Sequence, residues 1–120
     1  MVTRPSASPS TPRRGAELEA IVGESPGATV IRLRGRMRAG TARVLREAVE
    51  GVLAAGSTSL VLDLSEVVAD DELGLWVVPA VAGEAHDAGV AFTVVAPHRS
   101  LRSRLRRLGG RPFDLADTWP

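Results

Sequence analysis

One short segment, residues 60–75, constrains the fold of this 120-residue chain more than any other part. It begins with Leu60–Leu64, an apolar run with the length and composition of a buried strand. A short loop should follow, and three acids then precede a second apolar run: Asp70, Asp71 and Glu72. Acids at that place favour the N-terminus of a helix. A strand that leads into a helix start is a common position for a functional site in an α/β protein.

The other elements follow from hydrophobic spacing and from turn residues. Strands are expected at Leu18–Val22 and Thr29–Arg34, forming a hairpin around a turn at residues 24–27 that Gly35 closes. The remaining predictions are a helix from the N-cap Thr41 to about Ala55, a helix from residues 71–73 to about Ala88, a strand at Val90–Val95, a helix between Pro97 and Gly109–Gly110, and a short edge strand or turn around Phe113 and Leu115.

This ββαβαβα order predicts an α/β fold. Strand–helix–strand repeats imply parallel pairing with right-handed crossovers, here after an antiparallel start. We therefore expect a mixed, mostly parallel sheet of four to five strands, with helices packed on it.

Pro79 conflicts with a continuous second helix. It removes the amide that would pair with the carbonyl of Leu75, and a proline inside a helix costs about 3 kcal/mol or more. Either the first turn is distinct from the rest of the helix, or the helix kinks at Pro79.

Composition limits the class of protein. The chain has no cysteine, a net charge of +1 and no apolar run near the ~20 residues that cross a bilayer. Residues 1–15 are mostly Ser, Thr, Pro and Arg, so a disordered tail is expected before a single domain at residues 16–120. Without an apolar signal-peptide core, the expected location is cytoplasmic, with no membrane insertion.

The segment at residues 60–75 resembles the STAS family of anti-sigma-factor antagonist domains. In that family the strand ends in Asp-Leu-Ser, and a hydrophobic loop leads to Asp-Ser-Ser-Gly-Leu, whose first serine accepts phosphate from a partner kinase. Here Asp63-Leu64-Ser65 stands at the strand end, and Gly74-Leu75 follows at the family spacing. The resemblance covers roughly residues 17–117 and implies the STAS fold.

The register of this resemblance identifies a change at the phosphorylation site. Asp71 matches the motif aspartate, Glu72 stands in place of the acceptor serine, and Leu73 replaces the next serine. Asp70 occupies a place that is usually apolar in the family. The resemblance therefore implies a STAS domain whose phosphorylation switch has been removed.

Two roles are open for Glu72. Its permanent charge of −1 partly imitates a phosphoserine, which carries about −1.5 to −2 near neutral pH. In the family the phosphorylated state releases the anti-sigma kinase. The alternative is a solvated acid favoured by the helix N-terminus, worth about 0.3–1 kcal/mol.

The other two acids also have ordinary structural roles. We expect Asp71 to cap the second helix by accepting hydrogen bonds from amides two or three residues on. Asp70 replaces a residue that normally packs inward, so a loop shift could expose it. Three adjacent acids should raise the pKa of at least one carboxyl or recruit a cation.

Arginines mark a second departure from the family. After the second strand the family commonly has Gly-Glu-Leu-Asp, whereas this chain has Gly35-Arg36-Met37-Arg38. Arg38 could reach Asp71 or Glu72 and neutralise the acids. The alternative is an ordinary exposed arginine.

Chemistry other than binding has little support. His86 and His98 have no metal-ligand spacing, and no glycine-rich phosphate loop follows a strand. The last helix is rich in arginine, but no aromatic residue is interleaved for base stacking, so nucleic acid is not expected as a partner. Its arginines fall on two flanks of a leucine stripe: Arg99, Arg102 and Arg106 on one, and Arg104, Arg107 and Arg111 on the other.

We therefore predict a non-catalytic regulatory protein without a cofactor or metal, monomeric or weakly dimeric. The resemblance implies that it docks on an anti-sigma factor of the kinase fold. An accessory subunit of a transporter or larger complex is the main alternative, and a small nucleotide- or metal-binding protein is a more remote one. The predicted partner-binding residues are Arg36, Arg38, Thr41, Asp70, Asp71, Glu72, Leu73, Gly74, Leu75 and Trp76.

Overall fold

The computed structural model describes residues 17–109 and 113–118. The tail predicted at residues 1–15 and the helix-flanking Arg111 lie outside these ranges. In chain order the elements are β1 (Leu18–Ser25), β2 (Ala28–Met37), the short 3-10 helix η1 (Ala39–Thr41), α1 (Ala42–Ala54), β3 (Ser59–Ala69), α2 (Glu72–Leu75), α3 (Val77–Asp87), β4 (Ala91–Val95), α4 (Arg99–Leu108) and β5 (Asp114–Ala116).

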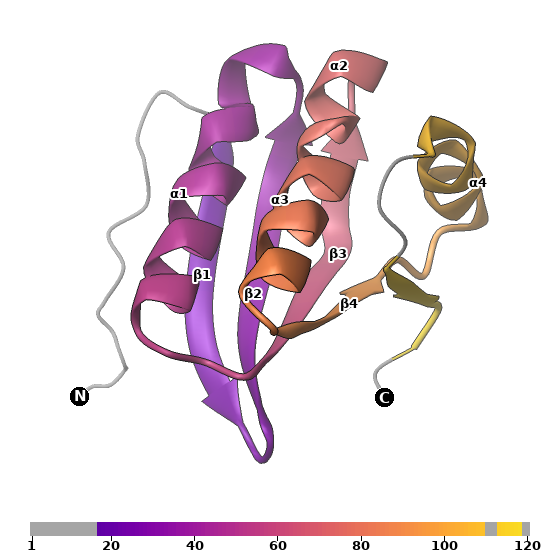
Figure 1. Cartoon of the computed structure of the whole chain (residues 1–120). Helices are drawn as coiled ribbons and strands as arrows, with labels where there is room; N and C mark the ends of the chain where they lie inside the picture. The colour runs from indigo at the N-terminus through magenta and orange to yellow at the C-terminus, as the bar shows by residue number, and fades with distance from the viewer. Residues whose placement is uncertain (1–16, 110–112, 119–120) are drawn as a thin grey trace.

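The five strands form one mixed sheet in the order β1-β2-β3-β4-β5. β1 is antiparallel to β2, and the other neighbours are parallel. Helices α1 and α3 lie side by side across one face, while α4 lies near β4 and β5 at the other edge (Figure 1). The α/β prediction with an antiparallel start is thus confirmed. Of the edge strand or turn expected around Phe113 and Leu115, the structure has the edge strand, β5.

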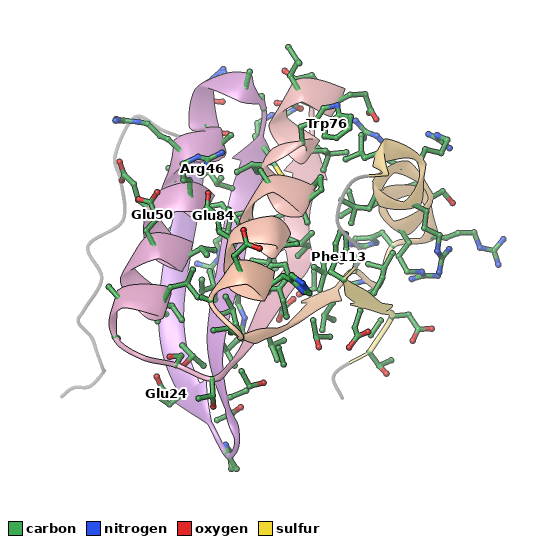
Figure 2. The ribbon with its side chains drawn as sticks, in the orientation of Figure 1. Glu24, Arg46, Glu50, Trp76, Glu84 and Phe113 are labelled. Atoms are coloured by element: carbon green, nitrogen blue, oxygen red, sulfur yellow. The ribbon has the colours of Figure 1, made fainter. Side chains whose placement is uncertain are left out.

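The core lies between the sheet and the α1–α3 layer. Leu60, Leu62 and Leu64 alternate along β3, and each is fully buried in it. Helix α1 presents the apolar stripe that its spacing predicts, and Arg46 of α1 donates to Glu84 of α3 at 2.7 Å (Figure 2). Apolar burial of this kind is the main favourable term in folding.

A bulge makes β3 longer than the sequence predicts. The expected loop after Leu64 is continued strand, because the pairing with β2 shifts between Arg32 and Arg34 instead of ending. Arg32 pairs with Asp63, but Arg34 pairs with Glu66, so β3 carries one extra residue there. The strand can therefore run on to Ala69.

The carboxylate of Asp63 holds this bulge. Its Oδ1 accepts from the backbone N–H of Ser65 at 2.9 Å and from the Ser65 hydroxyl at 2.6 Å. Asp63 is almost fully buried, and Arg32 Nε lies 3.5 Å from its other oxygen. The Asp-Leu-Ser sequence thus stabilises the bulge, which allows the strand to bend and to continue.

Strand β2 also continues past its predicted end. Gly35 does not close the hairpin: its φ of +119° suits glycine, and a Cβ there would collide with the carbonyl of Glu17. The next amide, of Arg36, donates to that same carbonyl at 2.8 Å. The backbone at residues 35–36 therefore lies close to Glu17, and Arg36 stands at the end of the sheet where β3 leads into α2.

The conflict at Pro79 is resolved by two separate helices. Helix α2 ends at Leu75, Trp76 links the two, and α3 begins at Val77, so Pro79 stands in the first turn of α3. Amides in a first turn have no partner within their own helix, so the proline loses no hydrogen bond. The sequence left two alternatives, a distinct first turn or a kink at Pro79, and the structure has the distinct first turn.

The core position Leu62 offers a direct test of the fold. Leu62→Ala should lower the free energy of unfolding by about 2–5 kcal/mol, because it leaves a cavity in the central strand. The matched control on the same strand is Val68→Ala, which removes a side chain 54% exposed and should cost less than about 1 kcal/mol. Urea denaturation measures both changes. Equal losses would contradict this assignment of the two strand faces.

Candidate functional site

The candidate site forms where α2 lies against the turn that follows β2. Gly74 makes this contact possible: a Cβ there would run into the backbone of Arg38, well inside contact distance. Gly74 and its neighbour Leu75 are buried. Only glycine lets the two backbones approach so closely.

Asp71 fastens α2 to that turn, as its predicted capping role requires. Its Oδ1 accepts from the amide of Gly74 at 2.6 Å, and its Oδ2 lies 3.4 Å from the amide of Ala39. Its backbone is extended, as is usual for an N-cap residue. One carboxylate thus bridges the helix start and η1.

Glu72 is paired with Arg104. The sequence predicts this arginine on a flank of the last helix, but it is not among the predicted site residues. Arg104 of α4 donates from Nε to Glu72 Oε1 at 2.7 Å, and its Nη2 lies 2.6 Å from the same oxygen. Arg104 Nη1 also donates to the carbonyl of Ala69 at 3.0 Å. From the sequence, only the place of Arg104 on a flank of the leucine stripe could be predicted. Its contact with Glu72 depends on how α4 packs.

Asp70 pairs with Arg36 in a two-pronged contact. Arg36 Nη2 donates to Oδ1 at 2.8 Å and Nε donates to Oδ2 at 3.0 Å. These hydrogen bonds, with the attraction between the charges, lower the pKa of Asp70 and raise the pKa of Arg36. The expected raised pKa is therefore absent at Asp70, and the cations that the acids recruit are arginines of this chain.

Of the two roles left open for Arg38, a contact with Asp71 or Glu72 is not the one observed. Its Nη2 lies 3.2 Å from Glu17 Oε1, on the side of β1. The hydroxyl of Thr41 accepts from the amide of Arg38 at 3.0 Å and donates to the carbonyl of Arg36 at 2.9 Å, which fixes the turn. Thr41 stands at the N-cap position of α1, but its side chain makes no capping hydrogen bond to that helix.

The face of the sheet opposite α1 and α3 has a small buried cluster of Val30, Val61 and Val95, and it also carries a row of ion pairs that leads to the site. Three arginines alternate along β2 and point away from the core. Arg32 and Arg34 stand opposite Asp63 and Glu66 of β3, whereas Arg36 reaches Asp70, which follows the end of β3 at Ala69. The pairs are Arg32 with Asp63 at 3.5 Å, Arg34 with Glu66 at 2.9 Å, and Arg36 with Asp70 at 2.8 Å. Asp70 is thus the last acid of a row, and it needs no loop shift.

Two large apolar side chains project from the site. Leu73 is 70% exposed and Trp76 is 45% exposed, on the side of α2 away from Gly74. Thr41, Gly74 and Leu75 are buried, so these three predicted site residues can shape the surface but do not form part of it. The accessible part is an apolar pair, which we call the α2 surface (Leu73 and Trp76), beside the pairs Arg36–Asp70 and Arg104–Glu72.

The described residues contain neither a cluster of metal ligands nor a membrane-spanning helix. Among residues 17–109 and 113–118, no three His, Asp or Glu side chains gather as a metal site would require. No helix in those ranges is both long and apolar enough to span a bilayer. Each of the three acids has at least one oxygen within hydrogen-bond distance of an arginine or a backbone amide.

The sequence matches the family model described as "Mlab, STAS domain" over residues 21–110, which is well over half of the chain and includes the site. No match was found among curated protein sequences.

Solved structures show the same fold. An anti-sigma factor antagonist from Mycobacterium paratuberculosis is 24% identical, with a TM-score of 0.66, covering 87% of this chain and 89% of that one. The anti-sigma factor antagonist SpoIIAA in its unphosphorylated form is 16% identical (TM-score 0.63, covering 83% and 89%). A serine-to-glutamate variant of Moorella thermoacetica RsbS is 15% identical (TM-score 0.69, covering 83% and 87%).

The contact at Gly74 gives a prediction for stability. Gly74→Ala should lower the free energy of unfolding by about 1–3 kcal/mol, because the added methyl group collides with backbone that cannot move aside cheaply. Gly51→Ala is the matched control: nothing lies near its Cβ position inside α1, so the helix should gain about 0.5–1 kcal/mol. Thermal and urea unfolding would show opposite signs. A neutral Gly74→Ala would contradict the close approach of α2 to η1.

The Arg36–Asp70 pair gives a prediction for pH. A carboxyl whose pKa is lowered on folding stabilises the protein above its unfolded pKa, and this stability is lost as pH falls through the folded value. Asp70→Asn should therefore destabilise the protein at neutral pH, and the difference from wild type should shrink below about pH 3.8, the ordinary value for aspartate. Urea unfolding across the acid range measures it. In an Arg36→Gln background the same substitution should lose most of its pH dependence; an unchanged dependence would refute the pairing.

Proposed function

The chain belongs to the STAS-domain family, and we propose that it is a non-catalytic anti-sigma-factor antagonist that docks on an anti-sigma factor of the kinase fold. The fold it shares with anti-sigma factor antagonists supports a regulatory role. The docking site is the α2 surface, with the Arg36–Asp70 and Arg104–Glu72 pairs beside it.

The observation that carries the proposal is the exposure of Leu73 and Trp76 at the family's motif. Leu73 lies on the short helix α2 and Trp76 follows its last residue, while Gly74 and Asp71 hold the other side of α2 in place. A rigid apolar pair with charged groups at its rim is the usual composition of a protein-binding centre, and tryptophan is enriched among the residues that dominate binding energy. The partner should present an apolar recess with polar edges.

Glu72 makes the docking surface independent of phosphorylation in this proposal. A glutamate has no hydroxyl that can accept phosphate in the family's reaction, and its side chain here is half exposed beside Arg104. The protein is thus expected to keep one binding state, in the cytoplasm, whatever the activity of a partner kinase.

The α2 surface can be tested directly by binding. Wild-type protein should capture a kinase-fold protein from a lysate of its host, and calorimetry on the purified pair then gives the affinity. Trp76→Ala should weaken binding by about 30-fold and Leu73→Ala by about 10-fold, because both side chains become buried at the centre of the interface. The matched control is Val22→Ala on β1, a partly exposed site remote from α2, which should bind within about twofold of wild type.

The same kinase-fold partner can be used to test whether position 72 is phosphorylated. Incubated with that kinase and ATP, Glu72→Ser should gain phosphate at position 72, whereas wild type should gain none, as mass spectrometry would show. Phosphate on Ser65 or Thr41 of wild type would contradict the loss of regulation. Capture of transporter subunits in place of a kinase-fold protein would overturn the antagonist assignment and favour the accessory-subunit alternative.

A further inference from the structure

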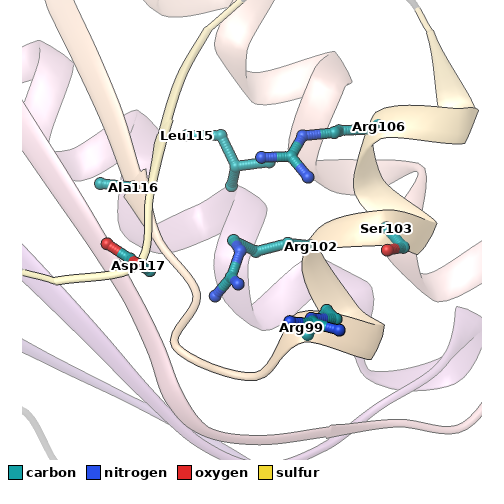
Figure 3. A pocket seen from close by; sticks show the side chains of 7 residues that line it. All are labelled: Arg99, Arg102, Ser103, Arg106, Leu115, Ala116 and Asp117. Atoms are coloured by element: carbon teal, nitrogen blue, oxygen red, sulfur yellow. The ribbon is translucent and has the colours of Figure 1, made fainter.

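A polar hollow lies between α4 and β5, away from the α2 surface. Its volume is about 450 Å³, within the range of small-molecule sites. Figure 3 shows arginine side chains of α4 on one side and the β5 segment on the other. Its lining residues are Arg99, Arg102, Ser103, Arg106, Leu115, Ala116 and Asp117.

The arginines of this hollow differ in their pairing from the arginines of the sheet and from Arg104, which lies on the same helix α4. Arg34, Arg36 and Arg104 each have a carboxylate oxygen within 3 Å. Among the residues that the structure describes, neither Arg99 nor Arg106 has a carboxylate within salt-bridge distance. Two guanidinium groups therefore stand in the hollow without a neutralising partner in this part of the chain.

The third arginine is positioned by the backbone. Arg102 Nη1 donates to the carbonyl of Ala96 at 2.7 Å and to that of Pro97 at 2.8 Å. These contacts fix one side of the guanidinium and leave its other N–H groups for a ligand. Arg102 is thus held in place before any ligand arrives, which lowers the entropy that binding must overcome.

Spacing along the helix brings the three charges together. Positions 99, 102 and 106 follow the three- and four-residue steps that share one flank of a helix, and Ser103 adds a hydroxyl. Asp117 supplies one negative charge on the opposite wall, so the hollow keeps an excess of positive charge. An anion between the arginines would relieve their mutual repulsion.

We propose that this hollow binds a small phosphate-bearing molecule, with its phosphate between Arg99, Arg102 and Arg106. The planar fork of arginine matches phosphate oxygens, and the Ser103 hydroxyl offers a further donor. Nucleic acid is disfavoured, because no aromatic side chain lines the hollow for base stacking. The site is separate from the α2 surface and does not depend on the proposed docking function.

Inorganic phosphate is the first probe. Titration into the full chain, followed by calorimetry and by shifts of the amide signals at constant ionic strength, should give saturable binding. Arg99→Gln and Arg106→Gln should each weaken it at least fivefold. The matched control is Arg43→Gln, which removes the same charge from an exposed position on α1 and should leave affinity within twofold.

Organic phosphates then define the ligand. Tighter binding of a small phosphate ester than of inorganic phosphate, lost in Arg106→Gln, would support a site that also holds the organic part. Binding that does not saturate, or that falls equally in Arg43→Gln, would overturn the proposal as a general charge effect. Duplex DNA that binds more tightly than any small phosphate, through the same arginines, would overturn it in favour of a nucleic-acid surface.

Discussion

The parallel pairing of β2 and β3, with the bulge that Asp63 holds, is the constraint on which the rest of the structure depends. The bulge keeps both strands paired to their ends, so that Arg36 and Asp70 meet and the turn at η1 lies under α2. Without the extra residue, the alternation of β3 would turn Val67 away from the core and Glu66 into it. A single buried carboxylate thus sets the geometry of a site several residues away.

The acids of the site are matched one by one within the chain. Asp70 is met by Arg36, Asp71 by the amide of Gly74, and Glu72 by Arg104. Each partner comes from a different element, so the cluster joins β2, α2 and α4. Because these charges have partners within the chain, the exposed apolar pair Leu73 and Trp76, on α2 and directly after it, is the part of the site that a partner protein can bury.

Local patterns predicted the elements of this fold, and contacts between distant segments account for what they missed. The mixed sheet, the cap at Asp71 and the edge strand all follow from short-range spacing and residue type. The sequence predicts a loop at residues 65–69, but they continue the strand, because a bulge breaks the alternation on which strand prediction rests. The partners of Arg38 and Glu72 were not predictable, since Glu17 and Arg104 reach them only through the packing of β1 and α4.

The contact with Arg104 is compatible with both roles open for Glu72, an acid at a helix N-terminus and a partial substitute for a phosphoserine. An acid at a helix N-terminus and a partial substitute for a phosphoserine would both face the same guanidinium, because arginine binds carboxylate and phosphate alike. The Arg104–Glu72 pair is in contact with solvent, with 26% of the Arg104 side chain and 52% of the Glu72 side chain exposed, so it should stabilise the fold by only about 0–1 kcal/mol. Its removal in Glu72→Ser should therefore leave the fold intact and free Arg104, so that a change in partner binding reports the role of the charge and not a loss of structure.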